Sequence, residues 1–182
     1  MLTLADVIEA LTHSRPAMKP LFITEAAIDS RQVIPGGMFV ALQGERVDGH
    51  NFVAQVFKRG VTVALIEHTV EGNFTTLDLR SGLPAFEFGK IQPPVCVLVP
   101  NTLAALQQVA AFWRRKLDLR VIGITGSIGK STTKEAIAQV LSQRYKTLKS
   151  AANLNNEIGL PLNVLKLTPG HEVAVLEMGF YV

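Results

Sequence analysis

The feature that most constrains the fold is a glycine-rich loop between a predicted strand and a predicted helix. Residues 121–124 are apolar and suit a buried strand, and residues 131–142 have the spacing of an amphipathic helix, with Ile137, Val140 and Leu141 inward. The loop between them, residues 125–131, contains Thr-Gly-Ser-Ile-Gly-Lys-Ser. Backbone N–H groups of such a loop, with the N-terminal end of the following helix, bind phosphate oxygens. The sequence therefore predicts a phosphate site.

Two side chains at the end of this loop have the chemistry that a bound nucleotide needs. Lys130 would neutralise phosphate oxygens, and the hydroxyl of Ser131 would ligate Mg²⁺. The strict Walker spacing requires glycine at position 124, where this chain has Ile124, so the motif is T-G-x-x-G-K-S. The alternative is an ordinary turn with an accidental Gly-Lys-Ser, which the strand–loop–helix context disfavours.

A second apolar strand is predicted to end at a carboxylate. Residues 173–176 are apolar and Glu177 follows them. A carboxylate at the carboxyl edge of a parallel sheet points into the ligand crevice and can hold Mg²⁺. The alternative is a surface glutamate that closes the strand. A polar cluster before the predicted helix 158–167 offers either helix caps or phosphate contacts: Asn153, Asn155, Asn156 and Glu157.

Strand and helix patterns alternate along the rest of the chain. Leu4 to Leu11 has helical spacing, with Thr3 as its N-cap and Asp6 three residues on. Further strands are predicted over 22–28, 38–42, 61–66, 95–99 and 145–148, and further helices over 52–57 and 102–116. Only short strands and loops are expected over 67–94. Alternation with fully apolar strands predicts an α/β fold with parallel sheets.

Composition and charge narrow the function. Hydrophobic residues make up 48% and charged residues 18%, which excludes a disordered chain. Residues 1–99 carry a net charge of −2 and residues 100–182 one of +5, which suits a phosphate-bearing ligand in the second part. Basic residues are not interleaved with aromatic ones, so a nucleic-acid partner is not expected. Cys96, the single cysteine, is expected to be a small core residue. The absence of a long apolar stretch and of a signal-like N-terminus predicts no membrane insertion and a cytoplasmic location.

Several segments together resemble the Mur ligases, the ATP-dependent amide ligases of bacterial cell-wall synthesis. In the second part these are the loop 125–131, the following Thr-Thr-Lys-Glu, residues 155–162 and residues 176–179. In the first part, Asp-Ser-Arg at 29–31, residues 33–44 and Asp-Gly-His at 48–50 resemble the family's uridine-nucleotide-binding domain. Ile128 stands where asparagine is common, and Ser131 where threonine is common.

The resemblance implies a domain organisation and a set of sites. Residues 1–99 would form a small UDP-substrate-binding α/β domain, and residues 100–182 the start of a P-loop mononucleotide-binding domain with a parallel sheet. Lys130 and Glu177 would be catalytic, and Ser131 and Glu177 would hold Mg²⁺. The residues implied for ATP are Thr125, Gly126, Ser127, Ile128, Gly129, Lys130, Ser131, Thr132, Asn156 and Glu157. Those implied for the UDP end are Ser30, Arg31, Asp48, Gly49 and His50.

The implied reaction joins two substrates with ATP. ATP would phosphorylate the terminal carboxylate of UDP-MurNAc-tripeptide, and the amine of D-alanyl-D-alanine would attack the acyl phosphate. The family's central domain continues well past residue 182. This chain is therefore expected to be an incomplete part, inactive by itself, of an enzyme that is monomeric at full length.

Two alternatives remain open. One is another ligase of the same superfamily, such as folylpolyglutamate synthase, which shares the ATP loop but lacks the Asp-Ser-Arg and Asp-Gly-His segments. The other is a non-catalytic module that binds a nucleotide sugar.

Overall fold

The computed structural model describes residues 1–44, 47–151 and 154–179 of the chain. It divides the chain into two compact units, Met1–Val109 and Ala110–Val182. The dividing point lies inside helix α3 (Thr102–Lys116), whereas the sequence placed the functional boundary near Val99, just before this helix. Which part each function occupies stays a prediction.

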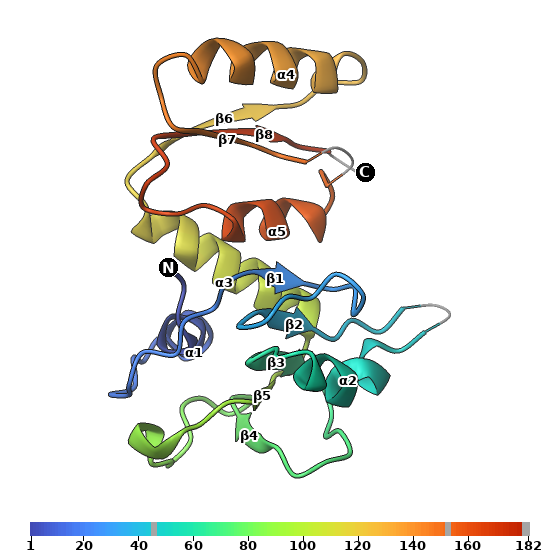
Figure 1. Cartoon of the computed structure of the whole chain (residues 1–182), viewed down its shortest axis with the longest axis vertical. Coiled ribbons are helices and arrows are strands. Elements are labelled where there is room, and N and C mark those ends of the chain that lie inside the picture. The colour runs from blue at the N-terminus through green and yellow to red at the C-terminus, as the bar shows by residue number, and fades with distance from the viewer. Residues whose placement is uncertain (45–46, 152–153, 180–182) are drawn as a thin grey trace. The chain divides into compact units, whose positions relative to one another are not determined.

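The first unit is built on five parallel strands in the order β1-β2-β3-β5-β4 (Figure 1). Helical elements lie between β2 and β3 and between β4 and β5, whereas loops join β1 to β2 and β3 to β4. The elements are α1 (Leu4–Thr12), β1 (Ala26–Ala27), β2 (Met38–Val40), η1 (Gly49–Phe52), α2 (Val53–Lys58), β3 (Val63–Ile66), β4 (Thr75–Asp78), η2 (Phe88–Lys90) and β5 (Val95–Leu98).

The central strands of this sheet are buried throughout, as their apolar sequences predict. No residue of β2, β3 or β5 is more than 4% exposed. Alternate residues of these strands pack with Val53 and Val56 of α2 in one core cluster. Cys96 lies in that cluster and is fully buried, and burial raises the pKa of its thiol to about 11. The prediction that Cys96 is a core residue is confirmed.

The start of the chain confirms one prediction and corrects another. Thr3 and Asp6 form a capping box at α1, in which each side chain bonds the backbone N–H of the other. The predicted strand over 22–28 was too long. Only Ala26 and Ala27 pair with β2, and the chain then turns at Asp29, whose side chain accepts from the backbone N–H of Arg31.

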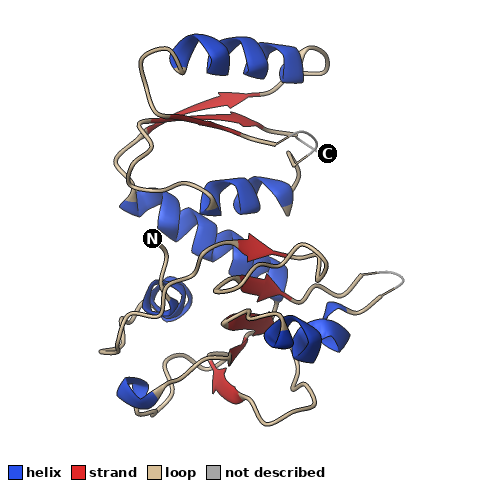
Figure 2. Ribbon diagram, in the orientation of Figure 1, coloured by secondary structure: helices blue, strands red, loops and turns tan. Residues whose placement is uncertain are grey.

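The second unit is a three-stranded parallel sheet between two helices (Figures 1 and 2). Its elements are β6 (Arg120–Ile124), α4 (Lys130–Leu141), β7 (Thr147–Lys149), α5 (Gly159–Leu165) and β8 (Val173–Glu177). Helices α4 and α5 cover opposite faces of the sheet, as the alternating pattern predicts. The order is β6-β8-β7, so β8 lies between β6 and β7.

The inward face of α4 differs from the predicted one. Ile137 and Leu141 pack on the core beneath the helix with Ala138, but Val140 is 71% exposed. Val140 is two residues from Ala138, which places it roughly 200° around a helix that turns about 100° per residue. The side chain that completes the buried face instead is Lys134, one turn before Ala138.

Among the described residues, no helix is both long enough and apolar enough to span a membrane.

Candidate functional site

The pairing of β6 with β8 brings the glycine-rich loop and Glu177 to the same edge of the second unit's sheet. The register places Ile124, the last residue of β6, directly opposite Glu177, the last residue of β8. Both strands run in the same direction, so the loop after β6 and the carboxylate at the end of β8 emerge together. This is the carboxyl edge, where ligands of parallel sheets bind.

The loop has the backbone form that a phosphate cradle requires. Gly126 has φ of +137° and Gly129 has φ of +81°, a region that L side chains rarely adopt. Gly129 is also the N-cap residue of α4, so the loop leads directly into the N-terminal end of that helix. The Lys130 ammonium group donates to the carbonyl oxygen of Gly126 at 2.7 Å, and so the lysine folds back over the loop.

The carboxylate of Glu177 contacts three side chains, two from α4 and one from the segment before α5. The hydroxyl of Ser131 donates to its Oε2 at 2.8 Å, and the amide of Asn155 donates to its Oε1 at 2.9 Å. The ammonium group of Lys134 lies 3.7 Å from Oε2. The buried hydroxyl of Ser150, which follows β7, accepts a hydrogen bond from the backbone N–H of Glu177 at 2.9 Å. The sequence singled out neither Ser150 nor Lys134 for this site.

These partners keep the carboxylate charged although it is buried. The hydrogen bond from Ser131 is the main cause that lowers the pKa of Glu177, and Asn155 and the charges of Lys134 and Lys130 act in the same direction. Burial acts the other way. An ionised carboxylate beside a hydroxyl is the kind of hard oxygen donor pair that Mg²⁺ prefers. The side chains present therefore fit the predicted metal.

The second polar cluster divides between this site and the helix that follows it. Asn155 reaches Glu177, whereas the side-chain oxygen of Asn156 accepts from the backbone N–H groups of Ile158 and Gly159. Asn156 thus supports the start of α5, and Glu157 is exposed. The roles of both at the phosphates stay predictions, and Asn153 lies outside the described residues. Thr125, Ser127, Ile128 and Thr132 are exposed around the loop.

In the first unit, polar residues also follow the carboxyl ends of the parallel strands. Asp29, Ser30 and Arg31 come after β1, Asp48 to His50 come after β2, and Glu67 with His68 comes after β3. The sequence predicted the first two groups for the UDP end of a substrate, but it missed the third. The available signal was the position of Glu67, directly after an apolar strand.

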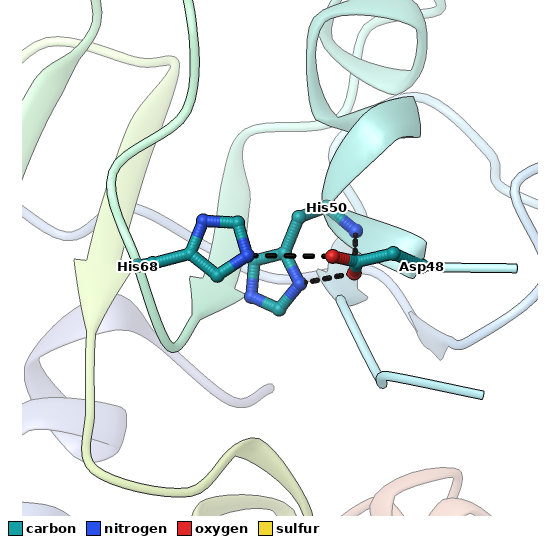
Figure 3. Close-up of side chains that lie close together, drawn as sticks. All are labelled: Asp48, His50 and His68. Atoms are coloured by element: carbon teal, nitrogen blue, oxygen red, sulfur yellow. Dashed lines mark hydrogen bonds and ion pairs between the residues drawn. The ribbon is translucent and has the colours of Figure 1, made fainter. Parts of the chain in front are cut away.

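Asp48, His50 and His68 form a compact cluster at this edge (Figure 3). One oxygen of Asp48 accepts from the backbone N–H of His50 at 2.9 Å and lies 2.6 Å from its ring Nδ1. The other oxygen lies 3.4 Å from Nε2 of His68. The two imidazole rings stack with centroids 4.0 Å apart. His50 is buried and His68 is exposed.

The hydrogen bonds of His50 determine its tautomer. Nε2 accepts the backbone N–H of Glu67 at 2.8 Å, so it carries no proton, and Nδ1–H donates to Asp48. Both ring nitrogens are therefore occupied. A metal at this cluster would have to displace one of these bonds, so the geometry favours a positioning role over metal binding.

Glu67 extends the same network to the start of α3. Its Oε1 accepts from both the backbone N–H and the hydroxyl of Thr102, at 2.7 and 2.9 Å. The Thr102 hydroxyl has a single proton, which it shares between this oxygen and the carbonyl oxygen of Ala41, also at 2.9 Å. The ends of β2, β3 and β5 are thus tied together by polar side chains, which makes this edge a rigid platform.

Ser30 and Arg31 lie on a separate part of the platform. Asp29 binds the Arg31 guanidinium through two oxygens, and hydrogen bonds from that side chain lower the pKa of Asp29 to about 2. The Arg31 side chain is 84% exposed, and Arg59 donates to the carbonyl of Ser30. No hydrogen bond between described residues joins Ser30 or Arg31 to Asp48 or His50.

Comparison with known families gives two matches, one in each part of the chain. Residues 22–87 match the Mur ligase family, catalytic domain, and residues 124–181 match the Mur ligase middle domain. The two matched regions contain the two clusters of polar residues described above.

The chain is similar to curated proteins named UDP-N-acetylmuramoyl-tripeptide–D-alanyl-D-alanine ligase. One from a Synechocystis species is 40% identical over 86% of this chain and 31% of its own length. One from Bacillus subtilis is 40% identical over 92% of this chain and 33% of its own length. The chain thus spans about a third of the length of the curated relatives that it matches.

Solved structures agree with these relatives. A crystal structure of MurF from Acinetobacter baumannii is 33% identical, with a TM-score of 0.74, over 97% of this chain and 35% of its own. MurF ligase from Thermotoga maritima in complex with ADP is 30% identical, with a TM-score of 0.66, over 88% of this chain and 33% of its own.

The Asp48 network makes the stability of the first unit pH-dependent. Hydrogen bonding from His50 lowers the pKa of Asp48 below its ordinary value of 3.8. The carboxylate therefore stabilises the fold above that value, and this contribution is lost as the pH falls through the lowered pKa. We expect Asp48→Asn to lower the urea midpoint most at about pH 5 and least at about pH 2.5. The exposed Glu71→Gln is the control. An equal decrease of the urea midpoint at both pH values in Asp48→Asn, or the same pH dependence in Glu71→Gln, would contradict the stabilising role of the Asp48 carboxylate.

Proposed function

We propose that this chain belongs to an ATP-dependent ligase of peptidoglycan precursor synthesis, because residues 22–87 and 124–181 match two Mur ligase family models. That enzyme would join D-alanyl-D-alanine to UDP-MurNAc-tripeptide. The observation that carries the proposal is the hydrogen bond between Ser131 of the glycine-rich loop and Glu177 of the neighbouring strand. It joins the loop proposed for the nucleotide phosphates to the carboxylate proposed for the metal, in a chain whose relatives carry the name of this ligase.

The two parts of the chain would divide the binding of the substrates. Residues 1–99 would hold the UDP end of the muramoyl peptide, and residues 100–182 would hold ATP. Supporting this division, the candidate residues of each part lie at the carboxyl edge of that part's own parallel sheet. The complete activity, the amine substrate, a monomeric state and a cytoplasmic location are part of the proposal for the whole protein.

The role of the second part is to position and neutralise the transferred phosphoryl group. Lys130 would leave the carbonyl of Gly126 and pair with phosphate oxygens, which the loop N–H groups also bind. Ser131 and Glu177 would hold Mg²⁺, which supplies charge neutralisation at the phosphates. Ser131 can change roles because its hydroxyl both donates and accepts, so rotation away from Glu177 exposes a lone pair.

The role of the first part is recognition. The exposed face of the Arg31 guanidinium is available for a phosphate, while Asp29 fixes its orientation. Asp48, Gly49 and His50 belong to the turn held by Asp48 and Glu67, so their positions are set before a ligand arrives. A site prepared in this way loses little entropy on binding.

Removal of the loop lysine tests the nucleotide part of the proposal. We expect Lys130→Met to weaken ADP binding at least about tenfold, because one charge-assisted contact to phosphate is lost. Lys146→Met, which removes an exposed lysine of the same unit, serves as the control. Calorimetric titration with Mg-ADP measures both. The assignment fails if the two variants bind ADP equally well.

Binding of the nucleotide sugar tests the substrate class. We expect saturable binding of UDP-MurNAc-tripeptide and none of folylpolyglutamate. Arg31→Ala should weaken the binding of UDP-MurNAc-tripeptide about tenfold through loss of a phosphate contact. Arg80→Ala is a matched control, because Arg80 pairs with Asp78 through the same two-bond geometry at the end of β4. Preference for the folate, or an equal effect of the two substitutions, would exclude this proposal.

A further inference from the structure

Lys134 is a buried cation of the Thr-Thr-Lys-Glu segment, and the proposed mechanism gives it no role. Among the described residues it is the only lysine or arginine that is buried, with 2% of its side chain exposed. It lies on α4, one turn after Lys130 and three residues after Ser131. Burial of an ammonium group is costly unless an opposite charge accompanies it. Its location therefore calls for a specific partner.

That partner is the carboxylate predicted to hold the metal. The Lys134 ammonium group lies 3.7 Å from Oε2 of Glu177, the same oxygen that accepts the hydrogen bond from Ser131. Its second anionic neighbour is Glu135, whose Oε1 is also at 3.7 Å. Glu135 is in turn paired with Lys149. Glu135 and Lys149 are exposed, so of these two carboxylates beside Lys134, Glu177 is the buried one.

With these contacts, both oxygens of Glu177 have partners within the chain. Ser131 and Lys134 occupy Oε2, and Asn155 occupies Oε1. The charge of Glu177 is already balanced by Lys134, and Lys130 adds a second positive charge at the same edge. A bare divalent cation would therefore meet repulsion here. The phosphates of a nucleotide would reverse that balance, because they bring several negative charges to the loop.

We propose that Lys134 is a positioning residue that acts as the internal counter-ion of Glu177, so that the site accepts a divalent cation only together with nucleotide phosphates. This rests on the proposed nucleotide role of the loop and specifies how that site is regulated. The pairing holds the Glu177 carboxylate in place, and it makes binding of metal and nucleotide mutually dependent. The coupling is reciprocal, because each ligand must raise the affinity of the other by the same factor.

The test uses Mn²⁺ as the probe, with free Mn²⁺ measured by electron paramagnetic resonance in the whole chain. Wild type should bind Mn²⁺ at least about tenfold more weakly without ADP than with it. Lys134→Met and Lys134→Gln should each tighten Mn²⁺ binding without ADP at least about tenfold, because Glu177 loses its counter-ion. Lys149→Met removes the exposed cation at the far end of the same network. This substitution should change the affinity for Mn²⁺ without ADP less than about twofold.

The outcomes separate this inference from the proposed function. If folded Lys134 variants bind Mn²⁺ no more tightly than wild type while ADP still binds, the counter-ion role is wrong and the nucleotide role stands. If the Lys134 variants tighten Mn²⁺ binding but wild type binds no ADP, the nucleotide role is wrong and the pairing of Lys134 with Glu177 stands. If neither variant folds, wild type decides: Mn²⁺ binding that is equally tight with and without ADP overturns the inference. A purely structural role of Lys134 would not raise metal affinity in any variant.

Discussion

The parallel pairing of β6 with β8 is the constraint on which the second unit depends. It sets Ile124 opposite Glu177, and so the loop that follows one strand meets the carboxylate that ends the other. The hydrogen bond between Ser131 and Glu177 is possible only in this register, because a shift by one residue would turn Glu177 to the opposite face. Local sequence alone forms the loop, but the strand pairing converts it into a site for both phosphate and metal.

The same physical principle organises the first unit. Its central strands β2, β3 and β5 are short and buried, and the polar side chains lie where the strands end. Glu67 connects the end of β3 to Thr102 at the start of α3, and His50 connects the turn after β2 to the backbone of Glu67. Buried polar groups of this kind are stable only when each is paired. Among the described residues, no buried side-chain nitrogen or oxygen lacks a partner.

The structural features that the sequence could predict are those with local causes. The glycine-rich loop, the capping box of Thr3 and Asp6, and the buried strands β2, β3, β5 and β8 all follow from spacing and residue type over a few positions. The sequence could predict the role of Glu177 for the same reason, since this residue directly follows an apolar run. The prediction that 121–124 is a buried strand was wrong, because only Ile124 of β6 is buried. The sequence could not predict the roles of Lys134, Ser150 and His68, because these roles depend on which strands become neighbours. A lysine in a helix is normally solvated, and no pattern along the chain marks Lys134 as buried.

The central claim is that Glu177 and the loop form one site for a nucleotide and its metal. Titration of the chain with ADP, with and without Mg²⁺, tests it most directly when wild type is compared with Glu177→Gln. Glu172→Gln, just before the amino end of the same strand, is the matched control. We expect Mg²⁺ to strengthen ADP binding in wild type and in the control, and to have little effect once Glu177 is neutral. An unchanged effect of Mg²⁺ in Glu177→Gln would contradict the claim.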